Sequence, residues 1–261
     1  MKVNKLVLLY LICLPISFEV RPSLEDYYPK KLKPTYSNYG ITGILELPNA
    51  RLMEEGSMRI GVSNSFPYKY TYISATPFSW LEASYKYTEE KNLLYGPVAY
   101  SGNQTLKDKS FDLKFRIVEE SYYLPEVSIG WNDLAGTGRF ASEYISASKK
   151  IRNVDITVGL GWGRLGKDKN IRNPFISIGD KFKYRQQDLG QGGSFNKDSW
   201  FSGEEISIYS GLEYYLYRHG LIVKIEYDTT NPDIGLNSPA LPVNSRFNFG
   251  INRPINENLD L

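Results

Sequence analysis

The chain has 261 residues, which is enough for one large β domain or for two average domains. Its 31 basic and 29 acidic side chains nearly cancel, so charge gives no argument for a nucleic-acid partner. One histidine and one cysteine are too few ligands for an ordinary zinc site. The 21 tyrosines and 12 phenylalanines favour β-strands. A mean hydropathy of −0.38 excludes a bundle of membrane helices, but it allows a membrane barrel with a polar lumen.

The first residues have the character of an export signal. Residues 1–5 are basic, and residues 6–18 are almost wholly apolar and too short to span a bilayer as a helix. We expect a signal peptide over 1–18 and an extended lead-in over 19–37. Cys13 follows the bulky Ile12, so we interpret it as an apolar thiol of the leader, with lipid attachment as the alternative.

From about residue 39 the chain repeats one unit, in which seven to ten residues of alternating character are followed by turn residues. This period of two predicts a series of strands that begin near Met58, Leu81, Phe111, Val127, Val154, Ile206, Leu221 and Phe247. Weaker strands are expected over 39–47, 69–76 and 141–149, and we interpret 39–47 as an accessory piece before the first full strand. The strand over 141–149 is ambiguous, because Glu143 shares a face with Ile145. No convincing helical period follows the leader.

The two faces of these strands favour a membrane barrel over a soluble sandwich. One face carries full charges in mid-strand, as a water-filled lumen permits, and the lumen-facing candidates are Glu82, Lys86, Asp112, Lys114, Arg116, Lys224 and Glu226. The apolar rows tend to end in aromatic residues, as interfacial girdles do, and the girdle candidates are Tyr85, Tyr87, Trp131, Trp162, Tyr214 and Tyr227. We therefore predict an all-β, antiparallel transmembrane barrel over 38–261, in contact with outer-membrane lipid. A soluble all-β fold is the alternative.

Connection lengths support the same architecture. Long connections are predicted at about 89–109, 133–140, 163–204 and 229–244, and short ones lie near 119–124, 150–152 and 218–219. Outer-membrane barrels alternate long external loops with short periplasmic turns. About ten to twelve strands are visible, and a new alternating strand begins at 258–261. Either the barrel continues past this chain or it is an unusual closed barrel; we favour a chain truncated at its C-terminus.

Few residues have the pattern of a catalytic site. The one histidine, His219, lies in a turn beside Gly220, so a serine or cysteine nucleophile has no evident base. Glu82, Asp112 and Glu226 are possible acids for glycan cleavage, but each has a basic neighbour on its own face, which is typical of a charge-compensated wall. We predict no catalytic, cofactor or metal residues and no enzyme. The alternative is an envelope barrel enzyme that modifies glycan or lipid.

Two glycine-rich runs do not form phosphate loops. Gly159–Gly163 lies inside an alternating strand with no following helix, so its glycines are expected to permit bending or close packing. Gly190–Gly193 lies in the long 163–204 connection, whose Trp200 and polar residues are suited either to glycan contact or to solvent.

Several blocks of the sequence resemble one known family. The blocks are Gly40–Arg51, Pro77–Tyr87, Lys107–Glu120, Gly136–Tyr144 and Gly159–Gly166. Together they resemble the YjbH-like family of outer-membrane proteins associated with exopolysaccharide and capsule production, clearly over 38–166 and loosely beyond. The resemblance implies a Gram-negative outer-membrane β-barrel, often lipid-anchored and much longer than this chain, that assists polysaccharide secretion with other export proteins. It supplies no catalytic residues.

Overall fold

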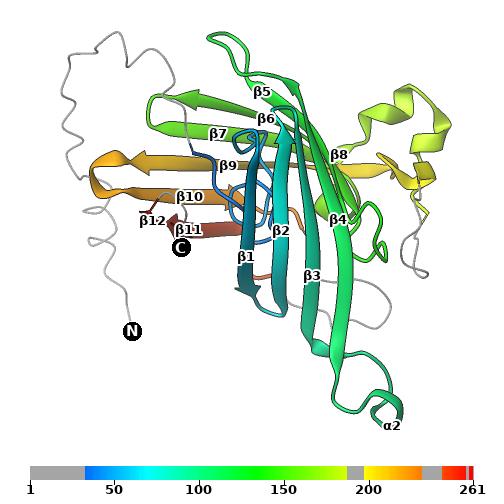
Figure 1. Ribbon diagram of the computed structural model, residues 1–261. Helices are drawn as coiled ribbons and strands as arrows, with labels where there is room; N and C mark the ends of the chain where they lie inside the picture. The colour runs from blue at the N-terminus through cyan, green and yellow to red at the C-terminus, as the bar shows by residue number, and fades with distance from the viewer. Residues whose placement is uncertain (1–32, 187–196, 231–242, 257–258, 261) are drawn as a thin grey trace, which may run out of the picture. The chain divides into compact units, whose positions relative to one another are not determined.

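The structure is a computed structural model that describes residues 33–186, 197–230, 243–256 and 259–260 (Figure 1). The expected signal peptide with Cys13, residues 19–32 of the lead-in and the run Gly190–Gly193 lie outside the described residues. So do most of the predicted 229–244 connection and parts of the C-terminal strand expected over 258–261.

The described chain is all-β and antiparallel, which confirms the predicted class. An eleven-stranded sheet has the order β1-β2-β3-β4-β5-β6-β7-β9-β10-β11, with the short β8 paired to β9. Its strands are β1 (Ser57–Ser65), β2 (Tyr68–Phe78), β3 (Leu81–Leu94), β4 (Thr105–Val118), β5 (Glu126–Asn132), β6 (Ser142–Ile151), β7 (Val154–Gly161), β8 (Ile171–Arg172), β9 (Glu205–Leu216), β10 (Leu221–Tyr227) and β11 (Phe247–Asn252). A separate pair joins β12 (Pro254–Asn256) to β13 (Leu259–Asp260).

Among the strands that the structure describes, the sheet is not closed into a barrel. β1 and β11 stand at the two ends of the strand order and do not pair with each other, so within the described residues the sheet is open. Alternation specifies which side chains share a face, but it carries no information about the partner of an outermost strand.

Helical structure in the described ranges is limited to short pieces. The α-helix α2 (Val98–Ser101) has four residues, and the 3₁₀ turns are η2 (Gly163–Gly166), η3 (Pro174–Ser177), η4 (Asp180–Phe182), η5 (Lys197–Ser199) and η6 (Tyr217–His219). Among the residues that the structure describes, no helix has the length and apolar character needed to cross a membrane.

The alternation predicted from sequence is visible in the burial of every long strand. In β1, Met58, Ile60 and Val62 are exposed and their neighbours are less so. In β4, Asp112 and Lys114 are buried while Phe111 on the opposite face is exposed. The weaker strands at 69–76 and 141–149 are also present, as β2 and β6. The sheet therefore has a polar inner face and an apolar outer face.

Residues 39–47 do not form the strand that the sequence predicts. Around them the structure has only isolated bridges, between Tyr36 and Thr42 and between Gly43 and Pro48. The backbone of this stretch bonds instead to side chains of the sheet, so it needs no neighbouring strand to satisfy its polar groups. It is an accessory piece outside the sheet, as expected.

Apart from the two-residue connection 66–67, the connections alternate in length as predicted. With every strand pair antiparallel, the connections 95–104, 133–141, 162–204 and 228–246 fall at one end of the sheet. The shorter connections 79–80, 119–125, 152–153 and 217–220 fall at the other end. The connection predicted over 89–109 is shorter in the structure, because β3 and β4 extend into it.

Glycines on the inner face make room for tyrosine rings of the next strand. Gly159 pairs with Tyr209, and a Cβ added at Gly159 would lie 2.1 Å from Cζ of that ring. Gly130 has the same relation to Tyr144. This covering of a strand glycine by a cross-strand aromatic ring stabilises the pairing. It agrees with the close-packing role expected for the run Gly159–Gly163.

Candidate functional site: the inner face and its N-terminal segment

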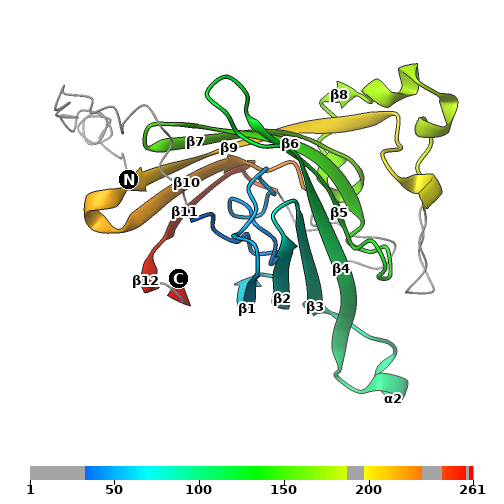
Figure 2. The same cartoon turned by 45° about the horizontal axis from the view of Figure 1, so that its top comes forward.

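The polar inner face is occupied by the chain's own residues 33–52, which we call the inner segment. Figure 2 shows this segment lying beside the sheet, with strands on more than one side of it. Most of its apolar side chains are buried, among them Ile41, Ile44 and Leu47. Leu47 belongs to a cluster with Tyr144 and Tyr209 of the inner face. The segment is therefore packed into the sheet rather than attached at its edge.

Two carboxylates of the inner face bind backbone amides of the inner segment. Glu226 accepts hydrogen bonds from the N–H groups of Leu45 at 3.0 Å, Glu46 at 2.9 Å and Leu47 at 3.3 Å. Glu82 accepts from the backbone N–H of Thr42 at 2.8 Å and from its hydroxyl at 2.6 Å. These residues of the inner face therefore bind the inner segment largely through its main chain.

Lysines of the same face bind the segment's carbonyls. Lys114 Nζ donates to the carbonyl of Thr42 at 2.5 Å and to that of Arg51 at 3.0 Å, and it lies 3.6 Å from Glu82. Lys224 Nζ donates to the carbonyl of Ile44 at 2.7 Å. Buried charges require partners, and here the segment's backbone supplies many of them.

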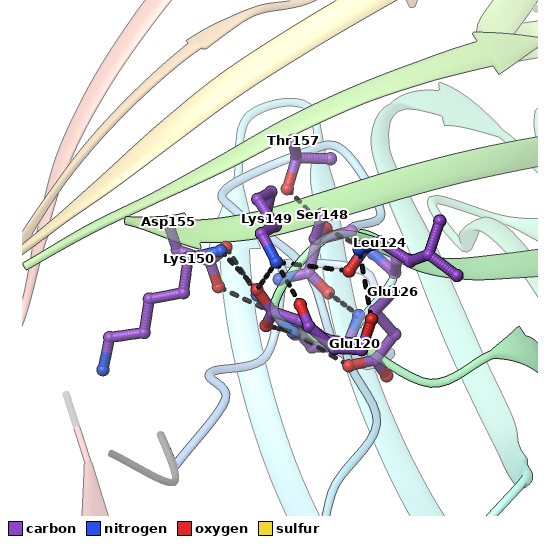
Figure 3. Close-up of polar contacts among 12 residues, drawn as sticks. Glu120, Leu124, Glu126, Ser148, Lys149, Lys150, Asp155 and Thr157 are labelled. Carbon is purple, nitrogen blue, oxygen red and sulfur yellow. Dashed lines mark hydrogen bonds and ion pairs between the residues drawn. The ribbon is translucent and has the colours of Figure 1, made fainter. Parts of the chain in front are cut away.

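Arg51 of the inner segment binds three carboxylates, two from strands of the sheet and one from the connection between β4 and β5. It forms two 2.9 Å hydrogen bonds with Asp155 of β7, and it also pairs with Glu126 of β5 at 2.9 Å and Glu120 at 2.6 Å. Figure 3 shows these three acids converging near Ser148. Burial alone lowers the pKa of Arg51, but the three carboxylates outweigh it and the net shift is upward.

All seven predicted lumen-facing charges lie on the inner face. Glu82, Lys86, Asp112, Lys114, Lys224 and Glu226 are buried there, and Arg116 is less completely buried. Lys86 pairs with Asp112 at 2.7 Å, and Arg116 pairs with Glu126 at 2.7 Å. The inner segment contacts Glu82, Lys114, Lys224 and Glu226 directly, so these side chains meet protein where the sequence predicts water. Sequence reasoning missed Arg51, because it lies outside the strands and no alternating pattern marks it.

Five of the six predicted girdle residues lie on the outer face with part of their surface accessible. Tyr85 and Tyr214 are exposed, while Tyr87, Trp131 and Tyr227 are partly buried. Trp162 is wrong as a girdle residue, because its exposed fraction is 0%. It directly follows β7, and the rings of Phe175 and Phe201 from the 162–204 connection pack against it at 5.3 and 5.1 Å.

The same connection explains the ambiguous Glu143. This outward-facing carboxylate is buried because Arg185 binds it through both terminal nitrogens, at 2.6 and 2.9 Å, and the backbone N–H of Phe201 donates to it at 2.9 Å. The 162–204 connection therefore folds over the outer face of β5–β7 and supplies the partner that the alternating pattern lacks.

The fold and the inner face together define an all-β protein whose antiparallel sheet buries its polar face around a segment of its own chain. The family model described as exopolysaccharide biosynthesis protein YbjH matches residues 35–261, and the chain belongs to this family. It is 40% identical over 226 residues to the uncharacterized lipoprotein YjbH of Escherichia coli strain K12. This alignment covers 86% of the chain and 32% of that relative, so the chain spans about a third of the relative's length. No solved structure matches the chain.

Proposed function

We propose that this chain forms part of an outer-membrane β-barrel that assists the secretion or assembly of an exopolysaccharide, and that it acts without catalysis. The observation that carries the proposal is the distribution of side chains over the sheet. Apolar residues such as Ile60, Val158 and Phe249 are exposed on the outer face, whereas lysines and acids are buried on the inner face. A soluble sheet protein buries the opposite set, while lipid favours an apolar exterior.

Family membership supports the exopolysaccharide part of the proposal, because the family model carries that description. The relative's name, a lipoprotein, supports an envelope location. Export partners and polysaccharide are the expected binding partners. The inner segment acts as a plug in this proposal, since it occupies the polar face that a channel would otherwise present to solvent.

The candidate acids favour a structural role over glycan cleavage. Glu82 and Glu226 direct their oxygens to amides and a hydroxyl of the inner segment, and Asp112 is bound to Lys86 and to the backbone N–H of Asp133. A general acid or base must instead reach a substrate proton.

A deletion strain tests the proposed function. Loss of the gene is expected to reduce surface polysaccharide, and the wild-type protein is expected to fractionate with outer membranes and to require detergent for extraction. Purified protein incubated with isolated surface polysaccharide should leave the polysaccharide chain length and composition unchanged. Recovery of the protein from the periplasm without detergent would contradict the membrane assignment, and release of a cleaved or modified glycan would contradict the non-catalytic role.

A further inference from the structure

The connection between β4 and β5, residues 119–125, presents an apolar tip that the proposed function does not use. Tyr123 is 86% exposed, and Tyr122 and Leu124 are also exposed. The two tyrosine rings contact each other edge to face at 4.7 Å. Figures 1 and 2 both show the loop that follows β4 projecting from the sheet at the top of the view. Large apolar side chains clustered on a surface mark a contact with a partner or with lipid.

Several backbone groups of this tip are paired within the protein. Ser121 N–H donates to the carbonyl of Leu124 at 3.0 Å, and Leu124 N–H donates to the Ser121 hydroxyl oxygen at 3.1 Å. Lys149 Nζ donates to the carbonyls of Ser121, Tyr122 at 3.1 Å and Leu124 at 3.2 Å. Glu120 lies 3.3 Å from the same ammonium (Figure 3) and balances its charge. These contacts pair two N–H groups and three carbonyls of the tip within the protein.

The position of Lys149 shows toward which face the tip leans. Its side chain belongs to the outward row of β6, together with Ile145 and Ile151, and Ile151 is exposed. Ile117 on the outward row of β4 is exposed as well. Because the outward Lys149 binds the carbonyls of the tip, the tip leans toward the outer face and continues its apolar surface.

We propose that the 119–125 connection inserts its apolar tip into the interfacial region of the phospholipid leaflet at the short-connection end of the sheet. The inference rests on the proposed membrane location. Backbone groups in a bilayer must be paired inside the protein, and Lys149 and Ser121 pair several of those in the tip. Tyrosine suits the headgroup region, with its ring in apolar surroundings and its hydroxyl in water. A tip built for water would instead leave its carbonyls free and its side chains polar.

Fluorescence quenching in phospholipid vesicles tests the insertion. A nitrobenzoxadiazole label on Tyr123→Cys should be quenched by lipids that carry a shallow spin label and should be protected from cobalt ions in water. The same label on His219→Cys, in an exposed turn at the same end of the sheet, is the matched control and should be quenched by cobalt. The parent protein, which contains Cys13 alone, gives the background.

A third label separates this inference from the proposed function. Ile60→Cys lies on the exposed outer face, and its label should be quenched by lipid if the sheet is in a membrane. Lipid quenching at residue 60 combined with cobalt quenching at residue 123 would overturn only the insertion of the tip, and a soluble protein partner would then be the better occupant. Cobalt quenching at both positions would overturn the membrane location as well.

A second variant tests the role of Lys149. Changing Lys149→Met removes the donor to three carbonyls, so the tip should leave the leaflet to hydrate them, and lipid quenching at residue 123 should fall at least twofold. Lys197→Met, which changes an exposed lysine at the opposite end, should leave the quenching unchanged. Unaltered quenching in the Lys149→Met protein would contradict the proposed role of internal backbone pairing.

Discussion

The inner and outer faces of this sheet are made by the same strands, yet they are stabilised in opposite ways. On the inner face, acidic and basic side chains are buried and bound to backbone groups or to one another, as Glu226 and Lys224 are bound to the inner segment. On the outer face, residues such as Ile156 and Val158 are exposed without polar partners. The stability of the inner face therefore depends on specific pairing, whereas that of the outer face depends on the solvent or lipid around it. Substitutions on the two faces should therefore destabilise the protein for different reasons.

The largest effect is expected from Arg51→Ala. The change leaves Glu120, Glu126 and Asp155 close together without their shared cation, and breaking such a buried network typically costs about 3–5 kcal/mol. Denaturant unfolding of the detergent-solubilised protein measures the loss. Arg172→Ala removes an exposed arginine and is expected to cost less than about 0.5 kcal/mol. Equal stability of the two variants would mean that the inner segment is not held by its charges.

We expect the stability of the protein to depend on pH through Asp133, because neighbouring cations do not fully compensate the charge of this acid. Burial and the neighbouring Asp108 and Asp112 raise the pKa of Asp133 to about 7. The folded state then binds a proton that the unfolded chain releases near pH 4, so this group's contribution to stability falls as pH rises from about 4 to 7 and is constant above. The loss is on the order of 4 kcal/mol. Asp133→Asn should remove this slope, and identical pH profiles of the two proteins would contradict the assignment.

A charge on the outer face should be costly only in lipid. Ile156→Arg is expected to destabilise the folded protein by about 2–4 kcal/mol if residue 156 lies near the middle of a bilayer. Folding titrations in lipid vesicles measure the cost. Ile178→Arg, at an exposed position in the 162–204 connection, serves as the control and should be nearly neutral. A neutral Ile156→Arg would place the outer face in water.

The smallest effect concerns packing rather than charge. Gly159→Ala would bring a methyl group against the Tyr209 ring, so the ring must move, at a cost of about 1–3 kcal/mol. Gly179→Ala adds a methyl group in open space and should change the unfolding midpoint little. If the two alanine variants unfold at the same midpoint, the packing of the Tyr209 ring does not require a glycine at position 159.

The sequence predicts which side chains lie on each face of the sheet, but it does not predict which segments pack over those faces. A period of two determines which side chains share a face, so the alternating pattern alone places Glu82 and Lys114 on the inner face. The pattern does not show that residues 33–52 fill the space above them, because that contact joins residues such as Thr42 and Glu82 that are far apart in the chain. Trp162 is misassigned for the same reason, since Phe201, which covers it, is distant in sequence. Closure of the sheet depends on the partners of its outermost strands, which a strand's own pattern does not encode.

The most direct test of the two-faced sheet is a spin-label scan along β1 in lipid vesicles, with one cysteine at a time from residue 58 to residue 63. We predict that collision with oxygen, which concentrates in lipid, is high at Met58, Ile60 and Val62 and low at the residues between them. Collision with a water-soluble nickel chelate should be low at those three positions. Equal accessibility at consecutive residues, or high nickel accessibility at Ile60, would contradict the account.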